Sequence, residues 1–115
     1  WIGAIERFKN VGIKRLKLIH RGFFCLEEKK YRNPPKWNLV KLVKNIFPSI
    51  DIICDPSHIS GDKNLLYSVS KKAISSGFNG LMIETHFDPE NALSDAKQQV
   101  NCSDFKELLK NLKLI

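Results

Sequence analysis

Apolar residues recur at helical intervals in four segments of this 115-residue chain. In the first segment, Ile2, Ile5 and Phe8 follow one another at the three-residue spacing that places side chains on one face of a helix. The later segments repeat this spacing, and a proline or glycine follows some of them, where a helix must end. The pattern predicts helices over residues 2–11, 39–47, 65–74 and 103–112.

Three short runs between these helices have the composition of β-strands. RLKLIH (15–20) alternates between polar and apolar residues, whereas IDIIC (50–54) and GLMIET (80–85) are mostly apolar. Strands that alternate with helices favour a parallel sheet with the helices packed outside it. The sequence therefore predicts one α/β domain with the order α-β-α-β-α-β-α.

The loops that follow strands differ from those that follow helices. Segments 22–37, 55–62 and 86–101 come after strands, and they are long and rich in charged residues and proline. The loop after the third helix, SGFNG (76–80), is short. Because ligands of parallel α/β proteins bind at the carboxyl ends of the strands, we expect the functional residues in the long loops.

His58, Glu84 and Asp95 are the candidate metal ligands. His58 follows one strand, Glu84 lies near the end of the next, and Asp95 lies in the loop after that. Adjacent parallel strands are about 4.8 Å apart, so side chains from their ends can share one ion. An imidazole with two carboxylates suits Mn²⁺, Fe²⁺ or Zn²⁺ better than Ca²⁺. The alternative is that no metal binds: His58 is then an ordinary loop histidine, Glu84 a lone carboxylate, and Asp95 the cap of a turn.

Four further residues are candidates for binding a substrate. Arg21 and Arg32 each offer a planar guanidinium that matches a phosphate or carboxylate, the alternative being a surface ion pair. Asp55 belongs to the same DPSH segment as His58, and it could instead cap a helix or turn. His86 comes two residues after Glu84, so both point to the same side if the strand continues, and His86 could support a metal ligand, contact substrate or play a structural part.

Charge and cysteine content narrow the function classes only partly. The net charge of +7 fits a nucleic-acid surface, a phosphorylated substrate or a general excess of lysine, but the 15 lysines are scattered, which disfavours nucleic acid. Three widely spaced cysteines with no CxxC pair favour a reducing cytoplasm over a disulfide scaffold, and Cys54 is expected in the core. No apolar run is long enough for a membrane helix, and we expect no membrane partner.

The motifs together resemble one enzyme family. IHRGF (19–23), YRNPPKW (31–37), IICDPSHISG (52–61) and GLMIETHFDPENALSDAKQQV (80–100) are similar to segments of metal-dependent 3-deoxy-7-phosphoheptulonate (DAHP) synthases, most of all the subtype often fused to a chorismate mutase. DPSH followed by IExH and then ALSDAxQ is a highly specific order. The related 3-deoxy-octulosonate 8-phosphate synthases resemble the chain less well.

The resemblance implies a (β/α)8 barrel that condenses phosphoenolpyruvate with erythrose 4-phosphate, the first step of the shikimate pathway. It also implies that His58, Glu84 and Asp95 are metal ligands for Mn²⁺ or else Fe²⁺, Zn²⁺ or Co²⁺, that His58 and Arg21 are catalytic, and that Arg21 binds phosphoenolpyruvate. The full-length protein is expected to be a homo-oligomer in the cytoplasm. The non-enzymatic alternative is a basic α/β binding module.

The chain departs from the family pattern in what it lacks. A fourth metal ligand, a cysteine in a GPCS-like segment, has no counterpart in residues 1–115, and neither does a phosphoenolpyruvate-binding lysine. A complete barrel needs about 250 residues. We therefore expect a partial, N-terminally truncated barrel domain over residues 1–115, roughly strands six to eight, that has no synthase activity alone.

Overall fold

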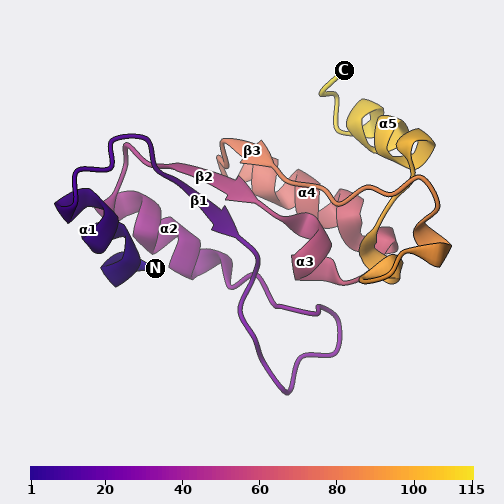
Figure 1. Ribbon diagram of the computed structural model, residues 1–115, viewed down its shortest axis with the longest axis horizontal. Helices are drawn as coiled ribbons and strands as arrows, with labels where there is room; N and C mark the ends of the chain where they lie inside the picture. Colours follow the sequence, from indigo (N-terminus) through magenta and orange to yellow (C-terminus); the bar gives the residue numbers. More distant parts are fainter.

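The computed structural model describes residues 1–115, and its centre is a three-stranded parallel sheet in the order β1-β2-β3 (Figure 1). Strands and helices alternate along most of the chain, which confirms the predicted α/β class. The elements are α1 (Ile2–Asn10), β1 (Lys17–His20), α2 (Trp37–Ile46), β2 (Asp51–Cys54), α3 (Pro56–Ser60), η1 (Lys63–Leu65), α4 (Leu66–Ser75), β3 (Gly80–Leu81), η2 (Pro89–Asn91), η3 (Ala96–Gln98) and α5 (Cys102–Asn111), where η marks a 3₁₀ turn.

The two faces of the sheet have different surroundings. Leu18 of β1 pairs with Ile52 of β2, and Ile52 is buried on the face that helices α2 and α4 cover in Figure 1. The next residue of β1, Ile19, points to the other face and is 40% exposed. Successive side chains of a strand point to opposite faces, so one face of this sheet is packed and the other is open.

Three small apolar clusters hold the helices in place. Ile5 of α1 and Val43 of α2 pack beside Ile50 just before β2. Cys54 packs with residues of α3 and α4 in a second cluster. The third cluster joins α4 to α5 and is separate from the first two. No helix is long and apolar enough to cross a membrane.

Segment 55–62, predicted as a loop, contains the short helix α3, so that prediction was wrong. The Asp55 side chain accepts a hydrogen bond from the backbone N–H of His58, and Pro56 occupies the first helical position. A side-chain acceptor before a helix and a proline at its first turn both favour helix initiation. Gly61 ends the helix with a φ of 66°.

Most predicted boundaries differ from the structure by one or two residues, and two of the differences have a clear physical reason. The strand predicted over residues 80–85 is paired only at Gly80–Leu81, because β2 ends at Cys54 and leaves no further partner. Beyond it, Thr85 forms an isolated parallel bridge with Val100. Helix α5 begins at Cys102, since Asn101, not Ser103, caps it by accepting a hydrogen bond from the Asp104 N–H.

Candidate metal centre

His58 lies in α3, directly after the carboxyl end of β2. Its backbone N–H donates to Asp55 Oδ1 at 3.0 Å, and its ring Nδ1 lies 2.7 Å from Asp55 Oδ2. Asp55 is 1% exposed, so both contacts are shielded from water. An ionised carboxylate only accepts hydrogen bonds, which assigns the ring proton to Nδ1 and leaves the Nε2 lone pair free to bind a cation.

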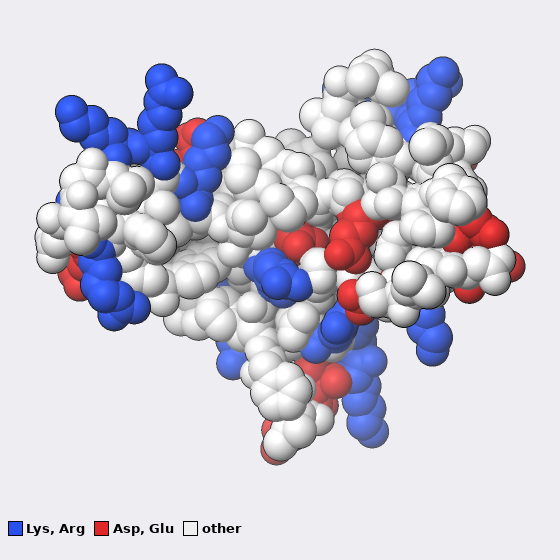
Figure 2. All heavy atoms as spheres, viewed as in Figure 1, with Lys and Arg blue, Asp and Glu red and all other residues white.

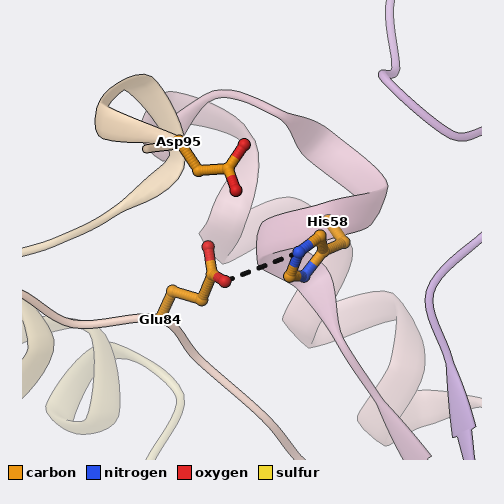
Figure 3. Close-up of side chains that lie close together, drawn as sticks. All are labelled: His58, Glu84 and Asp95. Carbon is orange, nitrogen blue, oxygen red and sulfur yellow. Dashed lines mark ion pairs between the residues drawn. The ribbon is translucent and has the colours of Figure 1, made fainter. Parts of the chain in front are cut away.

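Glu84 lies three residues beyond β3 and is held through its backbone. Its N–H donates to the buried Ser57 Oγ at 3.0 Å, and its carbonyl accepts from the Val100 N–H at 3.2 Å. Its side chain points toward α3, where Oε1 lies 3.5 Å from His58 Nε2. The dashed line in Figure 3 marks this pair.

Asp95 occupies the turn that precedes η3. Its φ is 54°, in the left-handed region that residues other than glycine rarely adopt, although aspartate tolerates it better than most. Such unusual backbone geometry occurs frequently at functional sites. The Asp95 Oδ1 atom pairs with Arg32 Nη1 at 2.5 Å.

The side chains of His58, Glu84 and Asp95 converge from three separate segments (Figure 3). One ligand atom from each lies within 4.8 Å of the others. Two ligands on opposite sides of an ion with bonds of about 2.1 Å are about 4.2 Å apart. The mixed nitrogen and oxygen donor set suits a divalent transition-metal ion, and a small closing movement of the three side chains would bring donors that lie within 4.8 Å to this separation.

Arg32 reaches this cluster because its loop lies directly on α3. The Arg32 and Asn33 N–H groups donate to the carbonyls of Ser60 and Ile59, at 3.3 and 3.1 Å. A Cβ at Gly61 would come within 2.6 Å of the Arg32 Cβ, so only glycine permits this approach. The loop therefore positions Arg32 through backbone contacts.

Arg21 follows β1 and lies beside the same cluster. Its Nε is 3.7 Å from Asp55 Oδ2, and its side chain is 58% exposed. A guanidinium with this much exposure keeps donors free for an anionic ligand. Figure 2 shows acidic side chains near the middle of the visible face with a basic side chain beside them, while other basic side chains project at separate points around the molecule.

His86 does not join the metal cluster, although it is only two residues from Glu84. Its Nδ1 lies 2.7 Å from the Asp88 carbonyl oxygen and 3.0 Å from the Asp88 backbone nitrogen, and its ring stacks on Phe87. His20 is fully buried, and Arg21 beside it is exposed.

The cysteines are separate from the cluster. All three are free, and none belongs to the group that could hold a metal ion. Burial, aided by the nearby Asp55 carboxylate, raises the pKa of the Cys54 thiol to about 12. This thiol stays protonated at neutral pH, which fits the core position predicted for Cys54.

Two residues of the site were not singled out from the sequence. Ser57 holds the Glu84 backbone, and Gln98 donates from Nε2 to Glu84 Oε2 at 2.6 Å. Gln98 is 1% exposed. Gln98 is the last residue of the ALSDAxQ motif, but its contact with Glu84 joins separate segments, and no local pattern predicts that contact.

The fold and the cluster define a class of protein: a parallel α/β structure with candidate metal ligands at the carboxyl ends of its strands. Comparison with known families narrows this class. Residues 1–114 match the model of the DAHP synthetase I family, and the chain belongs to that family.

Individual relatives agree with this assignment. The chain is 35% identical over 110 residues to the phospho-2-dehydro-3-deoxyheptonate aldolase of Thermotoga maritima, covering 96% of this chain and 32% of the relative. The crystal structure of the Thermotoga maritima DAHP synthase superposes with a TM-score of 0.86 at 33% identity, over 98% of this chain and 33% of that one. A truncated form of the Thermotoga maritima synthase gives a TM-score of 0.84 at 35% identity, over 95% of this chain and 41% of that one.

A second group of relatives matches less of the chain. The 2-dehydro-3-deoxyphosphooctonate aldolase of Geobacter sulfurreducens is 38% identical over 55 residues, which is 48% of this chain and 20% of the relative. The chain spans about a third of the length of the Thermotoga maritima relative, which matches nearly all of it.

Proposed function

We propose that this chain is the carboxyl-terminal part, about strands six to eight, of a DAHP synthase barrel. Three parallel strands in consecutive order, with helices on one face, support this placement. The open face of the sheet would then be the barrel interior, and its exposed Ile19 would be covered by strands that these residues do not supply. By itself the chain is expected to be inactive.

The proposed activity of the full-length protein is the condensation of phosphoenolpyruvate with erythrose 4-phosphate. The observation that carries it is the convergence of His58, Glu84 and Asp95 within 4.8 Å in a chain of this family. These three side chains would hold the divalent ion, for which Mn²⁺ is our first choice. When bound, the ion supplies Lewis acidity to an aldehyde oxygen.

The neighbouring residues would bind and orient the substrates. Arg21 places an exposed guanidinium beside Asp55, where it would hold the phosphoenolpyruvate anion for attack on the aldehyde. Asp55 fixes both Arg21 and the His58 ring, so we propose that it shapes the substrate site without contacting the reacting carbons. That Arg32 and His86 contact a substrate remains a prediction.

The proposal is tested with the full-length protein in an assay of condensation. Activity should disappear with a chelator and return with Mn²⁺. His58→Ala and Glu84→Ala should each lower Mn²⁺-dependent turnover on the order of 1,000-fold, because each removes a ligand and about 4 kcal/mol of stabilisation. Glu90→Ala, at an exposed position of η2, serves as the matched control and should keep the parental rate. Parental rates in both ligand variants would refute the metal assignment.

The same assay separates the alternatives. The partial match to 2-dehydro-3-deoxyphosphooctonate aldolases favours, as a second candidate, condensation with a longer aldose phosphate. Preference for that substrate over erythrose 4-phosphate would establish it. A binding module without catalysis would show neither activity, and any nucleic-acid affinity would fall steeply with salt. The free cysteines fit the cytoplasmic location that we propose.

A further inference from the structure

Gln98 is a buried amide whose two ends contact groups of opposite charge. Its Nε2 donates to Glu84 Oε2 at 2.6 Å, and its Oε1 accepts from Arg32 Nη1 at 2.8 Å. Only one orientation of the amide satisfies both contacts, since the carboxylate needs a donor and the guanidinium needs an acceptor. The charges on either side therefore fix the side chain in one state.

This orientation determines which Glu84 oxygen faces the candidate ion site. Oε2 is occupied by Gln98, whereas Oε1 lies 3.5 Å from His58 Nε2. Without the amide the carboxylate could rotate about its last bond, and its 31% exposed side chain could turn toward water. Gln98 thus holds Glu84 in the rotamer that presents Oε1 to the other ligands.

Arg32 extends the same contact to the second carboxylate. Its Nη1 atom bonds both Gln98 Oε1 and Asp95 Oδ1, so one nitrogen joins the supports of Glu84 and Asp95. Backbone hydrogen bonds to α3 hold the loop that carries Arg32. Because α3 also contains His58, the contacts that hold all three candidate ligands lead to the same helix.

We propose that Gln98 is a positioning residue which, through Arg32, holds Glu84 and Asp95 in the arrangement that receives a divalent cation. The inference rests on the metal site of the proposed function. In this arrangement the Nη1 atom of Arg32 supports the metal ligands. The Arg32 side chain is 49% exposed, so its other N–H donors are free for a substrate anion. Residues that support metal ligands in this way typically change metal affinity about 10–100-fold when removed.

The test measures Mn²⁺ binding to the full-length protein by the electron paramagnetic resonance signal of free Mn²⁺. Gln98→Met keeps the length of the side chain and removes both polar ends, and it should weaken Mn²⁺ binding about 10–100-fold. Gln99→Met is the matched control, because the Gln99 amide bonds only the Ser94 carbonyl at an exposed position. The control should stay within about threefold of the parental affinity, which corresponds to less than a single lost hydrogen bond.

Arg32→Met provides a second route if Gln98→Met folds poorly, since Arg32 is half-exposed. It should also weaken Mn²⁺ binding, and the double variant should lose less than the product of the two single losses, as expected for residues in one network. Losses that multiply, or affinities like the parental one in the single variants, would overturn the inference while leaving the metal site intact. Failure of the parental protein to bind Mn²⁺ would overturn both.

Discussion

The two histidines at the ends of adjacent strands lie in opposite surroundings. His58 follows β2 and has a carboxylate at 2.7 Å from Nδ1 and another at 3.5 Å from Nε2. His20 ends β1, and neither of its ring nitrogens has a hydrogen-bond partner. Aromatic rings surround it instead, with centroids 5.4–5.9 Å away, from Trp1, Phe23, Trp37 and Phe78.

Both histidines come at or after the carboxyl end of a strand, so the difference between them lies in the side chains that contact each imidazole. The ring of His58 is oriented by Asp55 and keeps one nitrogen free beside two carboxylates. The ring of His20 fills space among apolar neighbours, where burial lowers its pKa to about 4. One histidine therefore belongs to a polar site and the other to the core.

The largest effect should come from removing the His20 ring from among its aromatic neighbours. His20→Ala removes a fully buried ring and should lower the free energy of unfolding by about 3 kcal/mol, as large-to-small core substitutions do. Mn²⁺ affinity of the folded protein should not change. Chemical denaturation and Mn²⁺ titration of the full-length protein measure the two quantities. A tenfold loss of Mn²⁺ affinity with unchanged stability would show that His20 belongs to the metal site and not to the core.

The second largest effect should be a loss of folding stability in acid, caused by the buried ring of His20. The pKa of His20 falls from 6.5 in the unfolded chain to about 4 in the folded one, so the unfolded chain binds more protons between these values. Stability that is present above pH 6.5 is therefore lost as the pH falls toward 4, by up to roughly 3 kcal/mol. His20→Phe, which cannot titrate, should gain stability relative to the parental protein by this amount over the same interval. A constant difference across that interval would show that the His20 pKa is not depressed.

The polar cluster should respond to a change in Asp55, the residue that orients the ring of His58. Asp55→Asn has the same shape, but an amide that accepts from the His58 N–H places its NH₂ group beside Nδ1. That arrangement favours the tautomer with the proton on Nε2, and Mn²⁺ affinity should fall about 10–100-fold.

Asp62→Asn is the matched control for this change, because Asp62 caps η1 in the same way without contacting a histidine. It should leave Mn²⁺ affinity as it is, while both variants lose about 1 kcal/mol or less of stability as caps. Equal Mn²⁺ affinities of the Asp55 and Asp62 variants would show that the contact between Asp55 and His58 does not support metal binding.

The fold class and the three candidate ligands could be predicted from the sequence because their signals are local. Apolar periodicity located the helices, and the alternation of elements implied a parallel sheet, which places residues after successive strands at one edge. His58 follows the second predicted strand, Glu84 lies near the end of the third, and Asp95 lies in the loop after the third, so this topology places all three at one edge of the sheet.

The supporting contacts could not be predicted in this way. Gln98 bonds Glu84 across 14 residues and Arg32 across 66, and no local pattern encodes such pairs. The helix after β2 was missed because its five residues are too few for an apolar repeat, although Asp55 and Pro56 are a local start signal. The third strand ends early because a strand needs a paired neighbour, which is a property of the fold and not of the segment.

The smallest effect on the metal site should come from the third histidine, His86. Its Nδ1 contacts the backbone of Asp88 and its ring stacks on Phe87, so its contacts are local to the turn after Glu84. His86→Ala should change Mn²⁺ affinity less than about threefold, since it removes neither a ligand nor a contact with one. A rise in KM for either substrate with kcat unchanged would support its predicted substrate contact, because uniform binding would then be lost. A tenfold loss of Mn²⁺ affinity would instead place His86 with His58, and the division between a polar site and structural histidines would need to be redrawn.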